Sequence, residues 1–151
     1  MTQFLVVGVD DTEAGRQALI WALSEGRDGW KTVKAVSVWN YDYNGVDALL
    51  NPDAVQEKTA QKLDLAIKEA LDGQAPPPID TVVQQGRPDE VLCTEASGAR
   101  ALILGPPGSS RRSGHVVAGC LRRAPCPVVV LPQSYEDPNG GRHRARRFRW
   151  H

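Results

Sequence analysis

Glycine, serine and arginine residues gather between two apolar segments in the last third of the chain. Gly105, Gly108 and Gly114 bracket a run of hydroxyl and guanidinium side chains at residues 109–113, which read SSRRS. Glycine lets the backbone approach a ligand closely, and the start of a helix offers N–H groups to an anion. Serine and arginine side chains suit phosphate oxygens. The spacing therefore indicates a phosphate-binding loop that leads into a helix.

Two prolines in the same loop oppose this interpretation. Pro106 and Pro107 stiffen the chain and contribute no N–H group to an anion. A solvated loop that binds no ligand therefore remains an alternative to the phosphate-binding loop.

Apolar residues along the chain alternate between the pattern of buried strands and that of amphipathic helices. Because strands and helices alternate, the sequence favours an α/β fold with a doubly wound sheet. Gly26 and Gly29 are expected to end the first helix, and the polar and aromatic residues 40–53 are expected to form a long loop. Strands are predicted at residues 4–9, 32–39, 79–84, 101–104 and 128–131, and helices at residues 13–25, at 54–71, from a turn at 86–89 to residue 96, and at 114–123.

The alternating pattern ends at Pro132. We predict one α/β domain at residues 1–132 and a basic, flexible C-terminal tail at residues 133–151. Residues 1–100 carry 9 basic and 16 acidic side chains, a net charge of −7, and residues 101–151 carry 9 arginines and 2 acidic side chains, a net charge of +7. The tail ends in RHRARRFRWH, and arginine with interleaved aromatic residues suits nucleic acid. Binding of nucleic acid or of an acidic partner is one hypothesis, and a solvated extension is the favoured alternative.

Several segments of the chain resemble one protein family. They are VVGVDDTEAGRQALIWAL at residues 6–23, VQQGRPDEVL at 83–92, LILG at 102–105, GHVVAGCL at 114–121 and APCPVVVLP at 124–132. In combination they resemble the universal stress protein family over residues 3–132. The resemblance implies a single Rossmann-like domain with a five-stranded parallel sheet and helices on both faces. It also implies a regulatory or protective role and a homodimer formed through the strand at residues 128–131.

The resemblance also assigns residues to a nucleotide site. ATP-binding members of the family carry the pattern G-x2-G-x9-G-[S/T] after the fourth strand. Gly105 and Gly108 match the first two glycines, and Gly114-His115, followed by Val116, matches the final pair. Five residues separate Gly108 from Gly114 where the family pattern has nine, and histidine replaces the hydroxyl residue. We therefore expect an altered phosphate loop.

A second register would place the final pair at Gly119-Cys120, with ten residues after Gly108. This register moves the pair deep into the predicted helix and leaves fewer residues between the pair and the segment APCPV. The first register is therefore preferred. In that register His115 can donate a hydrogen bond to phosphate, or its larger side chain can occupy the phosphate space.

The nucleoside half of the site is assigned to residues near the first two strands. Asp10 matches the acidic residue of the family after the first strand, which contacts the adenosine part. Thr12 is expected to face the same cleft, and Val38 matches a position in the second strand whose backbone meets adenine. The alternatives are a helix-terminal charge for Asp10, an N-cap for Thr12 and a core position for Val38.

These assignments lead to three hypotheses. The first is weak or altered binding of an adenine nucleotide, with ATP, AMP and cyclic AMP as candidates. The second is a homodimeric interaction module that binds no nucleotide, in which His115 and the two prolines fill the phosphate space. The third is nucleic-acid or acidic-partner binding through the arginine-rich C-terminal region. The predicted binding residues are Asp10, Thr12, Val38, Gly105, Gly108, Ser109, Gly114, His115 and Val116.

The sequence does not support catalysis, a metal site or a membrane span. No GxSxG, HExxH or GxxxxGK[ST] motif occurs, so we expect a protein that is not an enzyme. The three cysteines lack CxxC spacing and are expected to be reduced, and the histidines lack metal-ligand spacing. No apolar run approaches the roughly 18 residues of a membrane helix, and the chain opens on a strand pattern without the charged start of a signal peptide. We therefore expect a cytoplasmic protein.

Overall fold

Five parallel strands form one sheet in the order β3-β2-β1-β4-β5 in the computed structural model, which describes residues 3–29, 31–107 and 111–132. The predicted α/β class with a five-stranded parallel sheet is confirmed. The predicted tail at residues 133–151 lies outside the described residues. The strands are β1 (Phe4–Gly8), β2 (Thr32–Trp39), β3 (Ile79–Gln85), β4 (Ala101–Leu104) and β5 (Val128–Val130). The helices within the described ranges are α1 (Glu13–Gly29), α2 (Tyr41–Leu50), α3 (Pro52–Leu71), α4 (Pro88–Glu95) and α5 (Arg111–Arg123).

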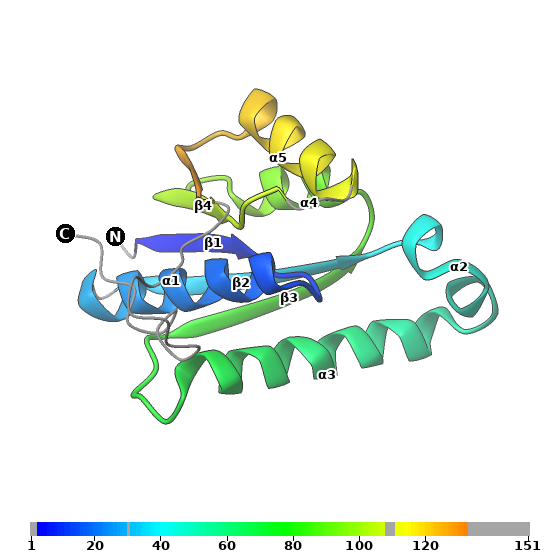
Figure 1. The fold of residues 1–151 in the computed structure, drawn as a ribbon, viewed down its shortest axis with the longest axis horizontal. Helices are drawn as coiled ribbons and strands as arrows, with labels where there is room; N and C mark the ends of the chain where they lie inside the picture. Colours follow the sequence, from blue (N-terminus) through cyan, green and yellow to red (C-terminus); the bar gives the residue numbers. More distant parts are fainter. Residues whose placement is uncertain (1–2, 30, 108–110, 133–151) are drawn as a thin grey trace.

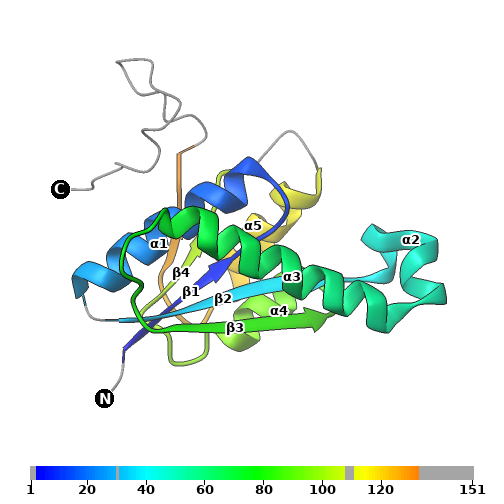
Figure 2. The ribbon, with the colours of Figure 1, turned by 90° about the horizontal axis from the view of Figure 1, so that it is seen from below.

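Helices cover both faces of the sheet, as predicted. Figure 1 shows α4 and α5 above the strands and α1 and α3 on the other side, and the view from below places α1 and α3 in front of the sheet (Figure 2). Two apolar clusters fill the two interfaces, one between the sheet and α1 with α3, the other between the sheet and α4 with α5. No helix among the described residues is long and apolar enough to cross a membrane.

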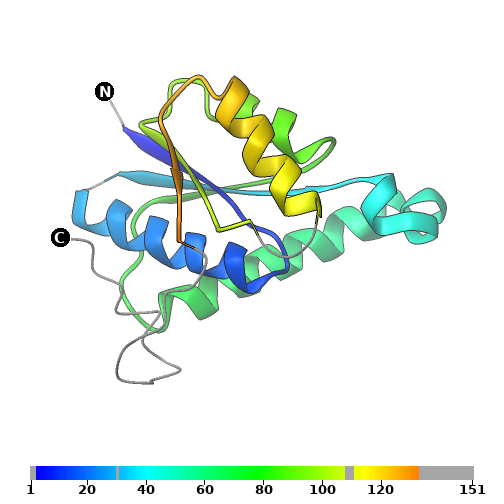
Figure 3. The same cartoon turned by 45° about the horizontal axis from the view of Figure 1, so that its top comes forward.

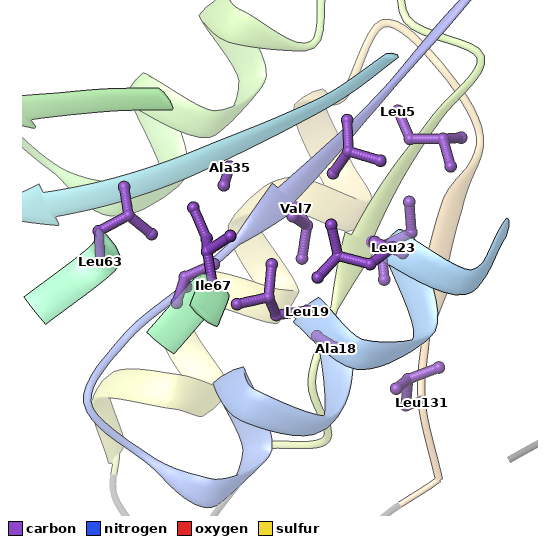
Figure 4. Packing of buried hydrophobic residues seen from close by; sticks show 13 residues of the cluster. Leu5, Val7, Ala18, Leu19, Leu23, Ala35, Leu63, Ile67 and Leu131 are labelled. Carbon is purple, nitrogen blue, oxygen red and sulfur yellow. The ribbon is translucent and has the colours of Figure 1, made fainter. Parts of the chain in front are cut away.

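The core beneath α1 and α3 is built from aliphatic side chains that alternate along the central strands. Leu19 from α1 and Leu63 from α3 point toward Val7 of β1 and Ala35 of β2 (Figure 4). Of these four, the least buried is only 2% exposed. Since alternate residues of a strand face opposite sides, β1 sends Leu5 and Val7 to this cluster and Val6 to the other one.

Residues 40–53 form helices, so the predicted long loop is wrong. Helix α2 occupies most of the segment and is divided at Gly45, whose φ of 59° interrupts the helical backbone, and α3 begins at Pro52. The side chain of Ala48 is fully buried in a small cluster with Trp39 and Val55. This contact with the end of β2 and the start of α3 stabilises a helix that its polar composition does not predict. Helix α2 extends past the carboxyl edge of the sheet (Figures 1 and 2).

The first helix continues three residues beyond Gly26, which was expected to help end it. Gly26 is buried inside α1 because the helix lies close to the start of β2. A Cβ atom at this position would stand 2.6 Å from Cγ2 of Val33 and 3.0 Å from the carbonyl oxygen of Lys31. The glycine therefore permits a close approach of helix and strand instead of acting as a helix stop.

The chain leaves the two neighbouring strands β1 and β4 toward opposite faces of the sheet. After β1 it enters α1 on one face, and after β4 it enters α5 on the other (Figure 3). The two strands are paired in parallel, with Val7 opposite Ile103, so their carboxyl ends lie side by side. In open α/β sheets, ligands bind at such a switch point, in a crevice outside the carboxyl ends of the strands.

Candidate functional site

The turn between β1 and α1 holds a carboxylate and a hydroxyl in direct contact. Oδ1 of Asp10 accepts a hydrogen bond from the backbone N–H of Thr12 at 3.1 Å and another from the Thr12 hydroxyl. Oγ1 of Thr12 in turn accepts the backbone N–H of Gly15 at 3.2 Å. Thr12 therefore acts as the N-cap of α1, which was the alternative assignment from the sequence. Both side chains remain exposed at the carboxyl edge of the sheet.

Gly105, directly after β4, packs against the same first turn of α1. A Cβ atom at Gly105 would overlap the carbonyl oxygen of Ala14 and come within 3.0 Å of its Cβ. Gly15 is equally confined, since a Cβ there would overlap the carboxylate of Asp10. The structure thus brings the predicted residues Asp10, Thr12 and Gly105 together around one helical turn. Sequence reasoning did not identify Gly15 as part of this arrangement.

Val38 lies near the carboxyl end of β2, opposite Gln84 of β3. Its half-buried side chain packs on the cluster beneath α4 and α5, so the core assignment for the side chain holds. The position remains at the carboxyl edge of the sheet, two strands away from Gly105 in the order β2-β1-β4.

Helix α5 begins three residues before the predicted start, which changes the place of Gly114 in the site. With α5 starting at Arg111, the N–H groups of residues 111–113 fall in its first turn, where a backbone N–H has no carbonyl partner within the helix. Gly114 has open space where a Cβ would stand, and the side chain of His115 is exposed. Val116 packs on the cluster beneath α5. Gly108 and Ser109 lie outside the described residues.

Contacts between α4 and α5 argue against the second register of the glycine pattern. Gly119 is buried against Asp89, and a Cβ at Gly119 would come within 2.8 Å of Cβ of Asp89. Gly119 therefore serves helix packing and does not belong to the loop. The side chain of Asp89 is 10% exposed. Its carboxylate accepts a hydrogen bond from the Arg87 guanidinium at 3.3 Å and lies 3.7 Å from a guanidinium nitrogen of Arg123. Arg87 thus pairs with Asp89 beside this helix contact.

The loop after β4 and the opposite edge of the sheet complete the surroundings of the candidate site. Pro106 is buried and Pro107 is half-buried in the loop after β4. An open hollow of about 420 Å³ lies at the opposite, amino edge of the sheet, beside Leu5, Trp21 and Ala101, and none of the predicted site residues lines it. Within the described ranges, no group of three or more histidine, cysteine or acidic residues is arranged to hold a metal ion.

Replacing Thr12 by alanine is expected to lower the free energy of unfolding by about 0.5–2 kcal/mol, because the N–H of Gly15 loses its partner. Urea denaturation followed by circular dichroism measures the change. Thr59→Ala is the matched control. Thr59 lies inside α3, where its hydroxyl bonds the carbonyl oxygen of Val55, and alanine has the higher helix propensity. Equal destabilisation by both changes would contradict a specific capping role for Thr12.

Comparison with known proteins gives a consistent result. Residues 1–132 match the model of the universal stress protein family. A universal stress protein of Mycobacterium tuberculosis (strain H37Rv) is 30% identical over 137 residues, which are 89% of this chain and 50% of that protein. The chain therefore spans about half the length of the curated relatives it matches.

Solved structures share the fold. A universal stress protein crystallised in complex with cAMP has a TM-score of 0.64 at 21% identity, over 88% of this chain and 98% of the other. A universal stress protein family protein of Arabidopsis thaliana with AMP bound has a TM-score of 0.59 at 18% identity, over 87% of this chain and 92% of the other. The match of the family model and the shared sheet with its helices agree with the predicted resemblance, and the chain belongs to the universal stress protein family.

Proposed function

We propose that this protein binds an adenine nucleotide in the crevice between the carboxyl ends of β1 and β4, and that it acts by binding and not by catalysis. The observation that carries the proposal is the convergence of Asp10, Thr12 and Gly105 on the first turn of α1. These groups stand at the switch point of the sheet, where the fold favours ligand binding. The bound cAMP and AMP of the two structural neighbours support the same ligand class.

The nucleoside and phosphate parts of the ligand would meet different elements. Thr12 bonds only to Oδ1 of Asp10, so Oδ2 remains available as an acceptor. A ribose hydroxyl is a suitable donor to this oxygen. The free N–H groups at residues 111–113 suit phosphate oxygens, since the first turn of a helix attracts anions. Gly114 leaves space above this turn, and the exposed His115 stands next to it. Val38 would border the base.

Titration calorimetry with ATP, AMP and cyclic AMP tests the proposal, and Asp11 supplies a matched control. Asp10→Ala is expected to weaken binding by about 10- to 100-fold, the effect of losing a hydrogen bond to a charged group. Asp11→Ala should leave affinity unchanged, because the Asp11 carboxylate is turned to Lys62 at 3.1 Å. Equal effects of the two variants, or no heat with any nucleotide, would overturn the proposed site.

A comparison of AMP with adenosine tests the phosphate half separately. Gly114→Val fills the open space beside the first turn of α5. It is expected to weaken AMP binding and to leave adenosine binding unchanged, because adenosine carries no phosphate. Equal weakening of both ligands would place Gly114 outside the phosphate site.

We further propose that two copies of the chain associate through β5. Strands β3 and β5 form the two edges of the sheet. The side chains of β3 that are exposed are polar, whereas β5 consists of three half-buried valines. Polar residues protect an edge strand from pairing, and an apolar edge invites it. The backbone N–H of Leu102 bonds to Pro127 and that of Leu131 bonds to Leu104, so alternate residues of β5 face β4. Val128 and Val130 therefore present their backbone groups to the open edge.

Val130→Pro removes an N–H group from the open side of β5 without removing a donor to β4. Sedimentation velocity is expected to show a dimer for the wild-type chain. The dissociation constant of the variant dimer is expected to be at least about tenfold higher, which corresponds to the loss of one hydrogen bond or more. Circular dichroism and thermal melting check that the variant keeps its fold. A monomeric wild-type chain, or an unchanged dimer in the folded variant, would contradict this interface.

A further inference from the structure

Three cysteines that lie far apart in the sequence share one apolar cluster. Cys93 is on α4, Cys120 is on α5, and Cys126 is in the turn before β5, and all three belong to the cluster beneath α4 and α5. Cys120 is fully buried, whereas Cys93 and Cys126 are partly exposed. All three are free thiols.

The packing of α4 on α5 brings Cys93 and Cys120 face to face. Asp89, one turn before Cys93 on the same side of α4, lies directly against Gly119, the neighbour of Cys120. The absence of a side chain at Gly119 allows the two helices to approach closely at this level. The two thiols lie near enough within the same cluster that each influences the pKa of the other. A disulfide requires Cβ atoms about 3.5–4.5 Å apart, and the close packing of α4 on α5 favours such an approach.

We propose that Cys93 and Cys120 form a modification site that hydroperoxides oxidise to a disulfide between α4 and α5. The Cys93 thiolate attacks one peroxide oxygen, the O–O bond breaks, and the sulfur becomes a sulfenic acid. The proton that the Cys93 thiol released joins the leaving oxygen, which departs as water, or as an alcohol from an organic peroxide. The Cys120 sulfur then attacks the sulfenic sulfur, the S–S bond forms, and a second water leaves with the Cys120 proton. Two thiols lose two electrons, and the peroxide gains them.

The surroundings set the relative speeds of the two steps. Burial raises the pKa of Cys93, and the nearby Asp89 raises it further, while the S–H of Cys120 and the Arg123 guanidinium lower it. Burial raises the pKa of Cys120 to about 12, with the Cys93 thiol and the charges of Asp89 and Cys126 adding to it. The first step is therefore slow at neutral pH and accelerates as pH rises, because the thiolate is the nucleophile. The second step also uses a thiolate and accelerates as pH rises, and it is favoured because Cys120 belongs to the same cluster as Cys93, so the attack is intramolecular.

The neighbouring Cys120 distinguishes this site from an isolated cysteine. A sulfenic acid with no thiol beside it is oxidised onward to sulfinic acid. Cys120 intercepts the sulfenic acid at Cys93 first, so the product is a reversible disulfide. The oxidation requires no bound nucleotide.

Peroxide treatment of the folded, full-length chain tests the proposal. After treatment at neutral and at mildly alkaline pH, the protein is denatured, remaining thiols are alkylated, and intact mass and proteolytic peptides are analysed. The expected product has lost two hydrogen atoms, carries one alkyl group, and joins the peptides of Cys93 and Cys120. It forms faster at the higher pH and disappears on treatment with a dithiol reductant.

Single variants identify the pair. Cys126→Ser is the matched control and should form the same bridge, whereas Cys93→Ser should not. In the Cys120→Ala variant, peroxide should oxidise Cys93 to sulfinic acid, which is measured as the gain of two oxygen atoms at Cys93. Thermal melting confirms that each variant is folded before oxidation. Sulfinic acid at Cys93 in the wild-type chain, a bridge that requires Cys126, or a bridge that forms only in denaturant would overturn the proposal.

Discussion

Leu19→Ala is expected to lower the free energy of unfolding by about 2–5 kcal/mol. Leu19 is fully buried between α1 and the central strands, so the shorter side chain loses burial and leaves a cavity among Val7, Ala35 and Ile67. Urea denaturation monitored by circular dichroism gives the difference directly. The effect matters for the site because α1 carries the turn on which Asp10 and Gly105 converge.

Leu65→Ala is the matched control, since it is the same chemical change on α3 at a side chain that is 57% exposed. It is expected to change stability by at most about 0.5 kcal/mol. If the two leucine variants were equally stable, the cluster beneath α1 and α3 would not be the core of this protein.

Gly105→Ala is expected to lower the free energy of unfolding by about 1–3 kcal/mol, the usual cost of overpacking. The added methyl group would overlap the backbone carbonyl oxygen of Ala14, and backbone yields less easily than the end of a side chain. Because the loop after β4 must then move away from α1, nucleotide affinity is expected to fall together with stability. Thermal melting with and without AMP measures both effects.

Gly114→Ala separates this steric effect from a general effect of glycine replacement. A Cβ at Gly114 meets no atom within 4 Å, and the residue lies inside α5. Alanine there is expected to raise stability by up to about 1 kcal/mol through its helix propensity. Destabilisation by Gly114→Ala that equals that of Gly105→Ala would contradict the packing described for β4 and α1.

Strands with one dominant pattern could be predicted from the sequence. The continuous apolar run in β1 and the short apolar runs in β4 and β5 are typical of strands buried on both faces. Strand β2 begins and ends at the residues predicted for it. Their parallel arrangement follows from the alternation with helices. Residues 40–53 could not be predicted in the same way, because the contact that stabilises α2 joins Ala48 to Trp39 and Val55. Such tertiary contacts leave no local periodicity.

The candidate site was predictable in part. Asp10, two residues after β1, could be proposed through the family resemblance, and Gly105 could be proposed because it directly follows β4 at the carboxyl edge of the sheet. The close approach of Asp10 and Gly105 to α1 could not be predicted, because it depends on the backbone of Ala14 and on the absence of a side chain at Gly15. The start of α5 at Arg111 was also missed, because the polar residues before Val116 show no apolar helical period and Gly114 has a low helix propensity. That start moves the free helical amides from Gly114 to residues 111–113.

The hydrogen bonds of Asp10 have a consequence for the thermodynamics of association. Thr12 fixes the orientation of the carboxylate before any ligand arrives, so the rotamer freedom of Asp10 is already lost in the free protein. In the proposed binding mode, a contact through Oδ2 avoids an entropic cost of about 0.5–1.5 kcal/mol for ordering a side chain. The acceptor is preorganised by the cap of a helix. The proposal therefore couples cap strength to ligand affinity, and a variant that loosens the first turn of α1 is expected to bind more weakly even where it touches no ligand atom.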